Sequence, residues 1–208
     1  MVLVTTNWIN TQLVTAFVTG VFGPLVVLWI RYIIEKRKAK PDMLTDALEI
    51  SSQVTNKLDT IREEFEADRV WIIQFHNGGH FYPTGKSIAK FSMLYETVAQ
   101  GADSIQNNFQ NIPVNLFSRS LNHLLGDSIL AIPDFKDETI ATYGLKYVAE
   151  ETGCKSGYGF AIKTIEGKFV GVMGVDFTKK KHKLSEEDIH QLLMYSSAIG
   201  GVLNNHLY

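Results

Sequence analysis

The segment GYGFAIKTIEGKFVGVMGVDF, residues 157–177, decides the fold class of this chain. Its two halves, Tyr158–Ile165 and Lys168–Thr178, are rich in apolar and aromatic residues, and Glu166-Gly167 separates them. Glycine supplies the positive φ that a tight turn needs, so the pattern predicts a β-hairpin. A sheet that contains this hairpin is expected to be mainly antiparallel.

Three apolar stretches upstream are predicted to be further strands. RVWIIQFH, residues 69–76, is dense in β-branched and aromatic residues, which predicts a central strand buried on both faces. Residues 87–99 form a second candidate whose later part could turn helical, and SILAIP, residues 128–133, a short third one. The polar stretch 101–127 is interpreted as a surface covering with a helix-like piece over residues 116–125. About five strands are expected in total.

Helices are predicted at both ends of the strand-forming region. Residues 42–66 carry apolar residues three and four apart in a seam close to a heptad, namely Leu44, Ala47, Leu48, Ser51, Val54, Leu58, Ile61 and Phe65. This seam packs on the chain's own sheet, pairs with a second subunit, or does both at different ends. Another helix is predicted over about residues 140–151, and Ser185-Glu186-Glu187-Asp188 opens the last helix as a capping box.

The element order predicts an α+β fold. Its first and last helices are expected side by side on one face of the sheet. The other face is left to the irregular segments between Gly78 and Glu138. A cleft on that second face is the natural place for a ligand.

The N-terminal part of the chain differs from the rest, because no charged residue precedes Arg31. Residues 8–34 are mostly apolar and long enough to cross a bilayer, and the hydroxyls of Thr15 and Thr19 can bond to carbonyls of their own helix. Basic residues follow this stretch, which argues against a cleaved signal peptide and predicts a single-pass protein with its N-terminus out. Residues 1–40 are therefore predicted to be a transmembrane anchor that contacts lipid through residues 8–34, and residues 41–208 a cytoplasmic domain.

Composition narrows the functional classes. The chain has 20 Lys plus Arg and 22 Asp plus Glu, so its net charge gives no reason to expect a nucleic-acid partner. Its one cysteine, Cys154, excludes an intramolecular disulfide framework and a cysteine-rich zinc site.

The chain resembles the GAF domain family in SILAIPDFKDE (residues 128–138), in residues 157–177 and in LSEEDIHQLLMYSSAIGGVLN (residues 184–204). The resemblance covers roughly residues 44–203 and implies a GAF-like fold. It implies little about function, because family members sense cyclic nucleotides, bilin chromophores, small metabolites or redox ligands, or only dimerise. RVWIIQFHNGGHF, with TGKSIAKFSMLYE after it, also resembles uncharacterised membrane-anchored proteins of bacteria and tailed bacteriophages.

Departures from the family patterns shorten the list of ligands. The Asn, Lys, Phe, Asp, Glu set of the cyclic-nucleotide subgroup does not match this chain in order. A bilin-attaching cysteine usually stands next to histidine, whereas Lys155-Ser156 follows Cys154. The methionine sulfoxide reductases related to the family use several cysteines, and one cysteine cannot perform that chemistry. The cofactor therefore remains unknown at this point.

A first group of candidate ligand-binding residues lies where the predicted central strand runs into a glycine-rich loop: His76, Asn77, His80 and Tyr82. The alternative is that His76 satisfies a buried carbonyl and that Asn77-Gly78-Gly79 only makes a turn. GHFYPTGKS, residues 79–87, is one residue too long for a phosphate-binding loop, so Lys86 is kept only as an anion contact. Two clustered histidines do not define a metal site.

A second group is expected to line the cleft: Lys90, Glu96, Asp134 and Tyr143. Lys90 and Glu96 would face the same side of a regular strand, although an exposed edge strand protected by charges explains them as well. Asp134 is interpreted first as a cap of the following helix and second as a ligand contact, and Tyr143, four residues before Tyr147, is interpreted first as packing on the sheet. Asp176 is interpreted as facing solvent. No nucleophile, base and acid can be assembled, so no catalytic residue is proposed and the chain is not expected to be an enzyme.

Two functions fit these observations. In the first, a membrane-anchored sensor binds a small ligand in the cleft and acts through dimerisation or a partner protein. In the second, the GAF-like domain is an empty scaffold whose terminal helices form a homodimer for assembly at the membrane.

Overall fold

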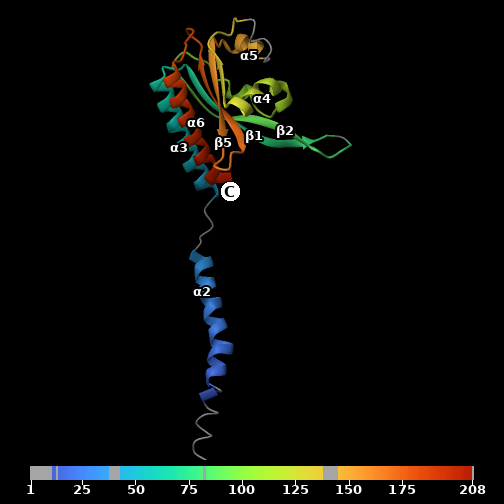
Figure 1. Ribbon diagram of the computed structural model, residues 1–208, viewed down its shortest axis with the longest axis vertical. Helices are drawn as coiled ribbons and strands as arrows, with labels where there is room; N and C mark the ends of the chain where they lie inside the picture. The colour runs from blue at the N-terminus through green and yellow to red at the C-terminus, as the bar shows by residue number, and fades with distance from the viewer. Residues whose placement is uncertain (1–10, 13, 38–42, 82, 138–144, 208) are drawn as a thin grey trace, which may run out of the picture. The chain divides into compact units, whose positions relative to one another are not determined.

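The computed structural model describes residues 11–12, 14–37, 43–81, 83–137 and 145–207 (Figure 1). The chain divides into two compact units, Met1–Asp46 and Ala47–Tyr208.

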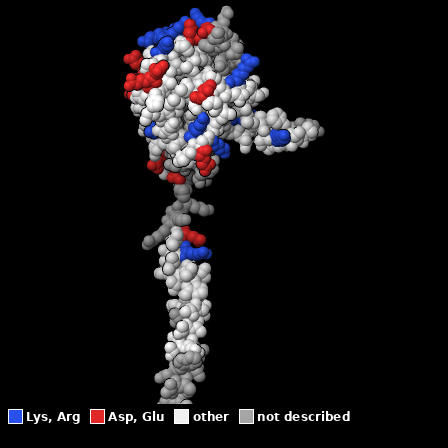
Figure 2. Space-filling view, viewed as in Figure 1, with Lys and Arg blue, Asp and Glu red and all other residues white. Residues whose placement is uncertain are grey.

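The first unit contains one apolar helical segment. A π-helical turn, η1 (Val18–Phe22), leads into α2 (Gly23–Arg37), and the stretch Val14–Glu35 has a mean hydropathy of 1.9. By length and composition alone this helix can cross a membrane. The Thr15 and Thr19 hydroxyls donate to the carbonyls four residues earlier, at 2.8 and 2.7 Å, as predicted. Figure 2 shows this helix white along its length, with charges only towards its C-terminal end.

The second unit is built on a six-stranded sheet in the order β3-β2-β1-β6-β5-β4, and all its neighbouring pairs are antiparallel. Gly167, at φ 80°, forms the predicted tight turn between the last two strands. The sheet has one strand more than predicted, because two residues of the polar stretch 101–127 pair with Lys90 and Phe91. The strands are β1 (Arg69–His80), β2 (Ser87–Val98), β3 (Ile112–Pro113), β4 (Ile129–Ile132), β5 (Ser156–Lys163) and β6 (Phe169–Phe177).

Two long helices, α3 (Met43–Glu64) and α6 (Glu186–Leu207), cover one face of this sheet (Figure 1). Ser185 and Asp188 form the predicted capping box at the start of α6: the Asp188 N–H donates to Ser185 Oγ at 3.1 Å, and the Ser185 N–H donates to Asp188 Oδ2 at 2.9 Å. The prediction of an α+β, GAF-like fold with the first and last helices on one face is confirmed.

The apolar seam of α3 behaves differently at its two ends. Val54, Leu58, Ile61 and Phe65 are buried against the sheet and α6. By contrast, Leu44 and Leu48, in the first two turns, are 67% and 62% exposed. The domain's own core therefore accounts for only the later part of the seam.

The opposite face of the sheet carries shorter pieces: η2 (Gln106–Asn108), η3 (Val114–Phe117), α4 (Ser118–Asp127) and α5 (Leu145–Thr152). They enclose a second apolar cluster that includes Ile73, Phe91, Met93 and Leu124. The helix predicted from residue 140 is described only from Leu145, since residues 138–144 lie outside the described residues.

A β-bulge changes the direction of side chains along β2. Ile72 pairs with Tyr95 and Ile73 pairs with Met93, which leaves Leu94 as the extra residue. Phe91 and Met93 therefore face the second cluster, whereas Tyr95 packs on the first. The strand continues to Val98, so the second strand is confirmed, and its later part does not take the helical alternative.

Candidate functional site

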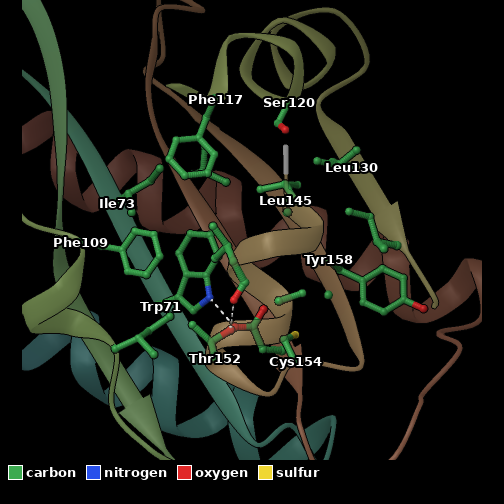
Figure 3. Close-up of a pocket in the computed structure, with 18 of the residues that line it drawn as sticks. Trp71, Ile73, Phe109, Phe117, Ser120, Leu130, Leu145, Thr152, Cys154 and Tyr158 are labelled. Carbon is green, nitrogen blue, oxygen red and sulfur yellow. Dashed lines mark hydrogen bonds between the residues drawn. The ribbon is translucent and has the colours of Figure 1, made fainter. Parts of the chain in front are cut away.

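A cavity of about 130 Å³ lies between the second face of the sheet and the segments that cover it (Figure 3). Its position is that of the predicted cleft. Most of its wall is aromatic or aliphatic, and the aromatic residues are Trp71, Phe91, Phe109, Phe117, Phe135 and Tyr158. The polar side chains in the wall are those of Ser120, Thr152, Cys154 and Asp176.

Two features of the sequence form this cavity: side chains alternate between the two faces of each strand, and glycines leave space on the second face. Trp71 and Ile73 are two apart on β1, so both side chains point to the second face. Gly174 of β6 allows the Trp71 ring to lie flat over it, because a Cβ there would be 2.1 Å from the indole. Gly157 and Gly159 on β5 present no side chain to the cavity. Residues with side chains at these three positions would fill the space that the aromatic ring and the cavity now occupy.

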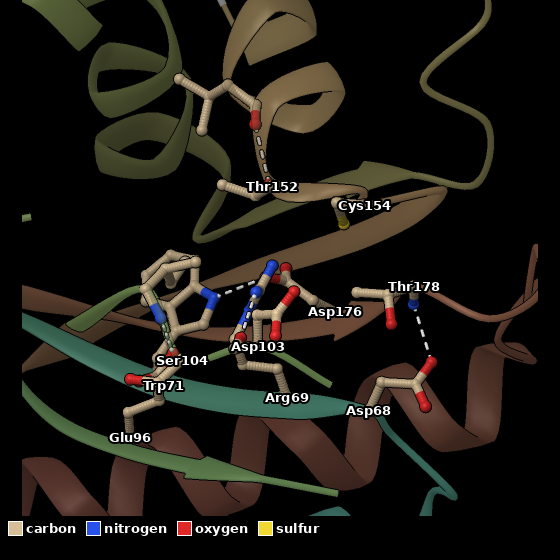
Figure 4. Close-up of polar contacts among 12 residues, drawn as sticks. Asp68, Arg69, Trp71, Glu96, Asp103, Ser104, Thr152, Cys154, Asp176 and Thr178 are labelled. Carbon is tan, nitrogen blue, oxygen red and sulfur yellow. Dashed lines mark hydrogen bonds and ion pairs between the residues drawn. The ribbon is translucent and has the colours of Figure 1, made fainter. Parts of the chain in front are cut away.

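A buried ion pair forms the polar end of the cavity (Figure 4). Arg69 is fully buried, and its Nε donates to Asp176 Oδ2 at 3.0 Å. The Trp71 indole N–H donates to the same oxygen at 3.0 Å. Arg69 and Asp176 are direct partners on adjacent antiparallel strands, so the sheet register itself brings the charges together. The interpretation of Asp176 as solvent-facing was wrong, because it lies within a strand covered on both faces.

The remaining nitrogens of Arg69 also contact groups of the protein. Nη1 donates to the Asp103 carbonyl at 3.0 Å, and Nη2 lies 3.0 Å from Asp176 Oδ2 as an ion pair. Nη2 is the single buried side-chain nitrogen or oxygen without a hydrogen bond among the described residues. Burial raises the pKa of Asp176, and the Arg69 charge with the hydrogen bonds from Trp71, Arg69 and Cys154 opposes that shift.

Cys154 lies beside this pair as a buried thiol. Its Sγ donates to the Ser156 carbonyl at 3.1 Å, and burial together with the Asp176 charge raises the pKa of the thiol far above its ordinary value. Thiolates are the nucleophilic form of cysteine, so this side chain is poorly suited to covalent attachment of a ligand.

The predicted residues from His76 to Lys90 lie on a different part of the domain, a two-stranded arm formed by the ends of β1 and β2 (Figure 1). His76 pairs with Lys90 across the arm, and its Nε2 shares a 2.9 Å hydrogen bond with Ser92 Oγ. Asn77, His80 and Lys86 are exposed. Lys90 lies over Gly78, where a Cβ would be 2.4 Å from its Cδ. None of these side chains lines the cavity.

Glu96 and Asp134 also lie outside the cavity wall. The bulge at Leu94 puts Glu96 on the face opposite to Lys90, contrary to the expectation for a regular strand. Glu96 Oε1 accepts from the Ile105 N–H at 2.9 Å, and Oε2 accepts from the Gln106 N–H at 3.1 Å, which anchors η2. Asp134 accepts from the Lys136 N–H at 2.9 Å and pairs with Lys181, and these contacts lower its pKa.

Tyr82 and Tyr143 lie outside the described residues. Tyr147, expected to pack on the sheet with Tyr143, is 73% exposed. No group of three His, Cys, Asp or Glu side chains suited to a metal ion occurs within the described part of the chain.

Sequence reasoning placed the cleft on the correct face but did not identify the residues that line it. The missed signal was a pair of opposite charges, Arg69 and Asp176, at the ends of two strongly apolar strands. An isolated charge in a buried strand needs a partner of opposite charge. Here Arg69 of β1 and Asp176 of β6 are partners of each other.

The domain has the fold of GAF domains. The far-red cyanobacteriochrome photoreceptor is similar to this chain with a TM-score of 0.61 and 13% identity, over 88% of this chain and 100% of that one. The PixJ GAF domain of Thermosynechococcus elongatus has a TM-score of 0.60 and 15% identity, over 78% and 89%. GAF3 from Slr1393 of Synechocystis sp. PCC6803 has a TM-score of 0.58 and 17% identity, over 75% and 94%.

Sequence comparison adds nothing to this structural likeness. No protein-family model matches the chain, and no curated protein matches it. At these identities the likeness concerns the fold alone.

Proposed function

We propose that this chain is a membrane-anchored, non-catalytic sensor or regulatory module that binds a small ligand on the second face of its GAF-like sheet. The observation that carries the proposal is the cavity itself, a mainly apolar space with one buried charge pair at its end. Ligand sites have this composition, with a few fixed polar groups in an apolar wall.

The signal would leave the domain through the elements that form the cavity wall. Leu145, Val148 and Thr152 of α5 line the cavity, as do Leu121 and Leu124 of α4. A ligand that binds better to one position of these short helices would increase the fraction of molecules with the helices in that position. The readout would be a change in self-association or in binding to a partner protein.

The proposed location rests on the N-terminal segment. We propose that residues 8–34 cross the membrane with the N-terminus outside, which leaves the domain in the cytoplasm. The basic residues after the apolar stretch, beginning at Arg31, support this orientation.

The test of the sensor proposal is native mass spectrometry of the full chain, released from detergent micelles, before and after denaturation. A retained small mass that disappears on denaturation, together with a higher unfolding temperature when that compound is added back, is the expected result. A ligand-free spectrum and no shift across a panel of metabolites would contradict it.

A scaffold function without a ligand is the second candidate, and the exposed Leu44 and Leu48 favour it. Leucines that are 67% and 62% exposed in consecutive turns of one helix form the start of a pairing seam. Under this proposal Leu48→Gln lowers the dimer fraction measured by cross-linking in membranes. Ile165→Gln is the matched control, because Ile165 is 83% exposed in the β5–β6 turn. Equal cross-linking of wild type and Leu48→Gln would contradict the seam.

A further inference from the structure

The hydrogen-bond donors of the cavity wall are already engaged within the protein. The Trp71 N–H donates to Asp176, and the Thr152 hydroxyl donates to the Val148 carbonyl at 2.7 Å. The Cys154 thiol donates to Ser156, and Ser120 also has an interaction of its own. A ligand that needs donors from its site, such as a carboxylate or a phosphate, would lose its hydration without replacement.

The charges at the cavity also disfavour an anion. Asp176 is the charged residue in the wall, and Arg69, which neutralises it, is not part of the wall. The hydrogen bonds from Arg69 and Trp71 both end on Oδ2. Oδ1 lies towards the Gly157 side of the cavity, 3.3 Å from where a Cβ at that glycine would be. The Cys154 thiol also shares a hydrogen bond with this carboxylate, but the carboxylate has about four acceptor sites, so Oδ1 can still accept a hydrogen bond from a ligand, while the wall excludes a second negative charge.

The volume limits the ligand to roughly one ring. An engineered apolar cavity of about 150 Å³ binds benzene, and the cavity here, at about 130 Å³, is of similar size. A nucleotide or an open-chain tetrapyrrole is several times larger than a single ring.

We propose that the cavity takes an uncharged, single-ring molecule, mainly apolar, with one hydrogen-bond donor directed at Asp176. Phenols are the simplest molecules of this class. This inference rests on the proposed sensor function and names the chemical class of its ligand.

Phenol, toluene and benzoate test the inference, because they have nearly the same shape and differ in donor and charge. The full chain in nanodiscs, with Trp8→Phe and Trp29→Phe, retains Trp71 as its single tryptophan, and Trp71 lines the cavity. Its fluorescence is titrated with each probe, and empty nanodiscs correct for partitioning into lipid. Phenol is expected to bind saturably, toluene at least about threefold more weakly, and benzoate at least about a hundredfold more weakly.

Gly159→Ala shows whether binding occurs in the cavity. A Cβ at Gly159 would lie 3.6 Å from Val172 and 3.7 Å from Leu124, so alanine fits the strand but takes space from the cavity. We expect a loss of phenol affinity of about tenfold. Gly126→Ala is the control, because the added Cβ meets no described atom within 4 Å and Gly126 is not in the wall.

Each other outcome is decisive. Tighter binding of benzoate than of phenol, lost in Gly159→Ala, would overturn the ligand class and leave the sensor function standing. Equal affinities for toluene and phenol would overturn the role of Asp176. If no probe binds but native mass spectrometry shows a retained molecule, the class is wrong. If neither experiment shows a ligand, the sensor function itself fails.

Discussion

Arg69 and Asp176 form the most consequential pair of single residues in the domain. A buried ion pair adds little net stability over apolar residues of similar volume, but the loss of one partner leaves a buried charge uncompensated. Arg69 cannot release its proton, so removal of the Asp176 carboxylate leaves a buried positive charge without a partner and destabilises the fold.

Asp176→Asn is therefore expected to lower the free energy of unfolding by about 3–5 kcal/mol. The double variant Arg69→Met with Asp176→Asn should be more stable than Asp176→Asn alone, because it removes the orphaned charge. Urea unfolding of the chain with Trp8→Phe and Trp29→Phe in nanodiscs, followed by Trp71 fluorescence, measures both. Additive losses in the double variant would mean that the two side chains are not coupled.

Asp68 gives the domain a dependence on pH. Its Oδ2 accepts from the Thr178 N–H at 2.7 Å and the Lys179 N–H at 2.9 Å, and Lys179 Nζ lies 3.1 Å from Oδ1. Burial raises the pKa of Asp68, but these backbone hydrogen bonds and the Lys179 charge outweigh it, and the pKa is lowered. A carboxylate with a lowered pKa stabilises the fold above its unfolded pKa and loses that contribution as pH falls through the folded value.

Asp68→Asn should thus cost about 1–3 kcal/mol at pH 7. The difference from wild type should shrink as pH falls below about 4, where the unfolded carboxyl binds a proton, and it should vanish below the lowered pKa of the folded state. Thermal unfolding at pH 7 and pH 3 compares the two proteins. Asp103→Asn is the control, because Asp103 is exposed and contributes its backbone carbonyl to Arg69. A cost for Asp68→Asn that is the same at both pH values would contradict the carboxylate's role.

At the scale of elements, the packing of α6 on the sheet depends on one glycine. A Cβ at Gly200 would lie 2.4 Å from the Lys163 carbonyl oxygen, a backbone atom that cannot rotate away. The next residue, Gly201, has no described atom within 4 Å of such a Cβ. A side chain is therefore excluded at Gly200 and has room at Gly201, although the two residues are adjacent on the same helix.

Gly200→Ala is expected to destabilise the domain by about 1–3 kcal/mol, because α6 must move away from the end of β5. Gly201→Ala should be neutral or stabilise it by up to about 1 kcal/mol through helix propensity. Thermal unfolding of the paired variants measures the difference. A stabilising Gly200→Ala would show that α6 is not seated as closely as described.

The sequence predicts most elements well where the hydrophobic periodicity is strong. It predicts them less well where pairing with distant residues determines the structure. The hairpin around Gly167, the capping box at Ser185 and the strand RVWIIQFH depend on local chemistry. The bulge at Leu94 and the strand Ile112–Pro113 depend on partners distant in sequence. The cavity residues were missed for the same reason. In the local sequence, a polar loop residue such as His80 resembles a binding residue, whereas Trp71 and Asp176 resemble ordinary strand residues.

The whole molecule combines a GAF-like domain with an apolar N-terminal helix that is long enough to cross a membrane, and the proposed anchor makes a testable prediction about the side on which the domain lies. A basic flank after the apolar stretch predicts that the N-terminus is outside and the domain inside. Cys154 is the only cysteine and is buried, so Cys154→Ser gives a cysteine-free background for accessibility labelling.

Two single-cysteine variants in that background report the two sides. Thr6→Cys should react with a membrane-impermeant maleimide in intact spheroplasts, whereas Lys180→Cys, at an exposed position, should react only after lysis. Because a bilayer excludes the charged reagent, the labelling ratio before and after lysis assigns each residue to one side. Labelling of Lys180→Cys in intact cells, with Thr6→Cys protected, would invert the orientation and place the ligand cavity on the outer side. Recovery of both variants in the soluble fraction would contradict the anchor itself.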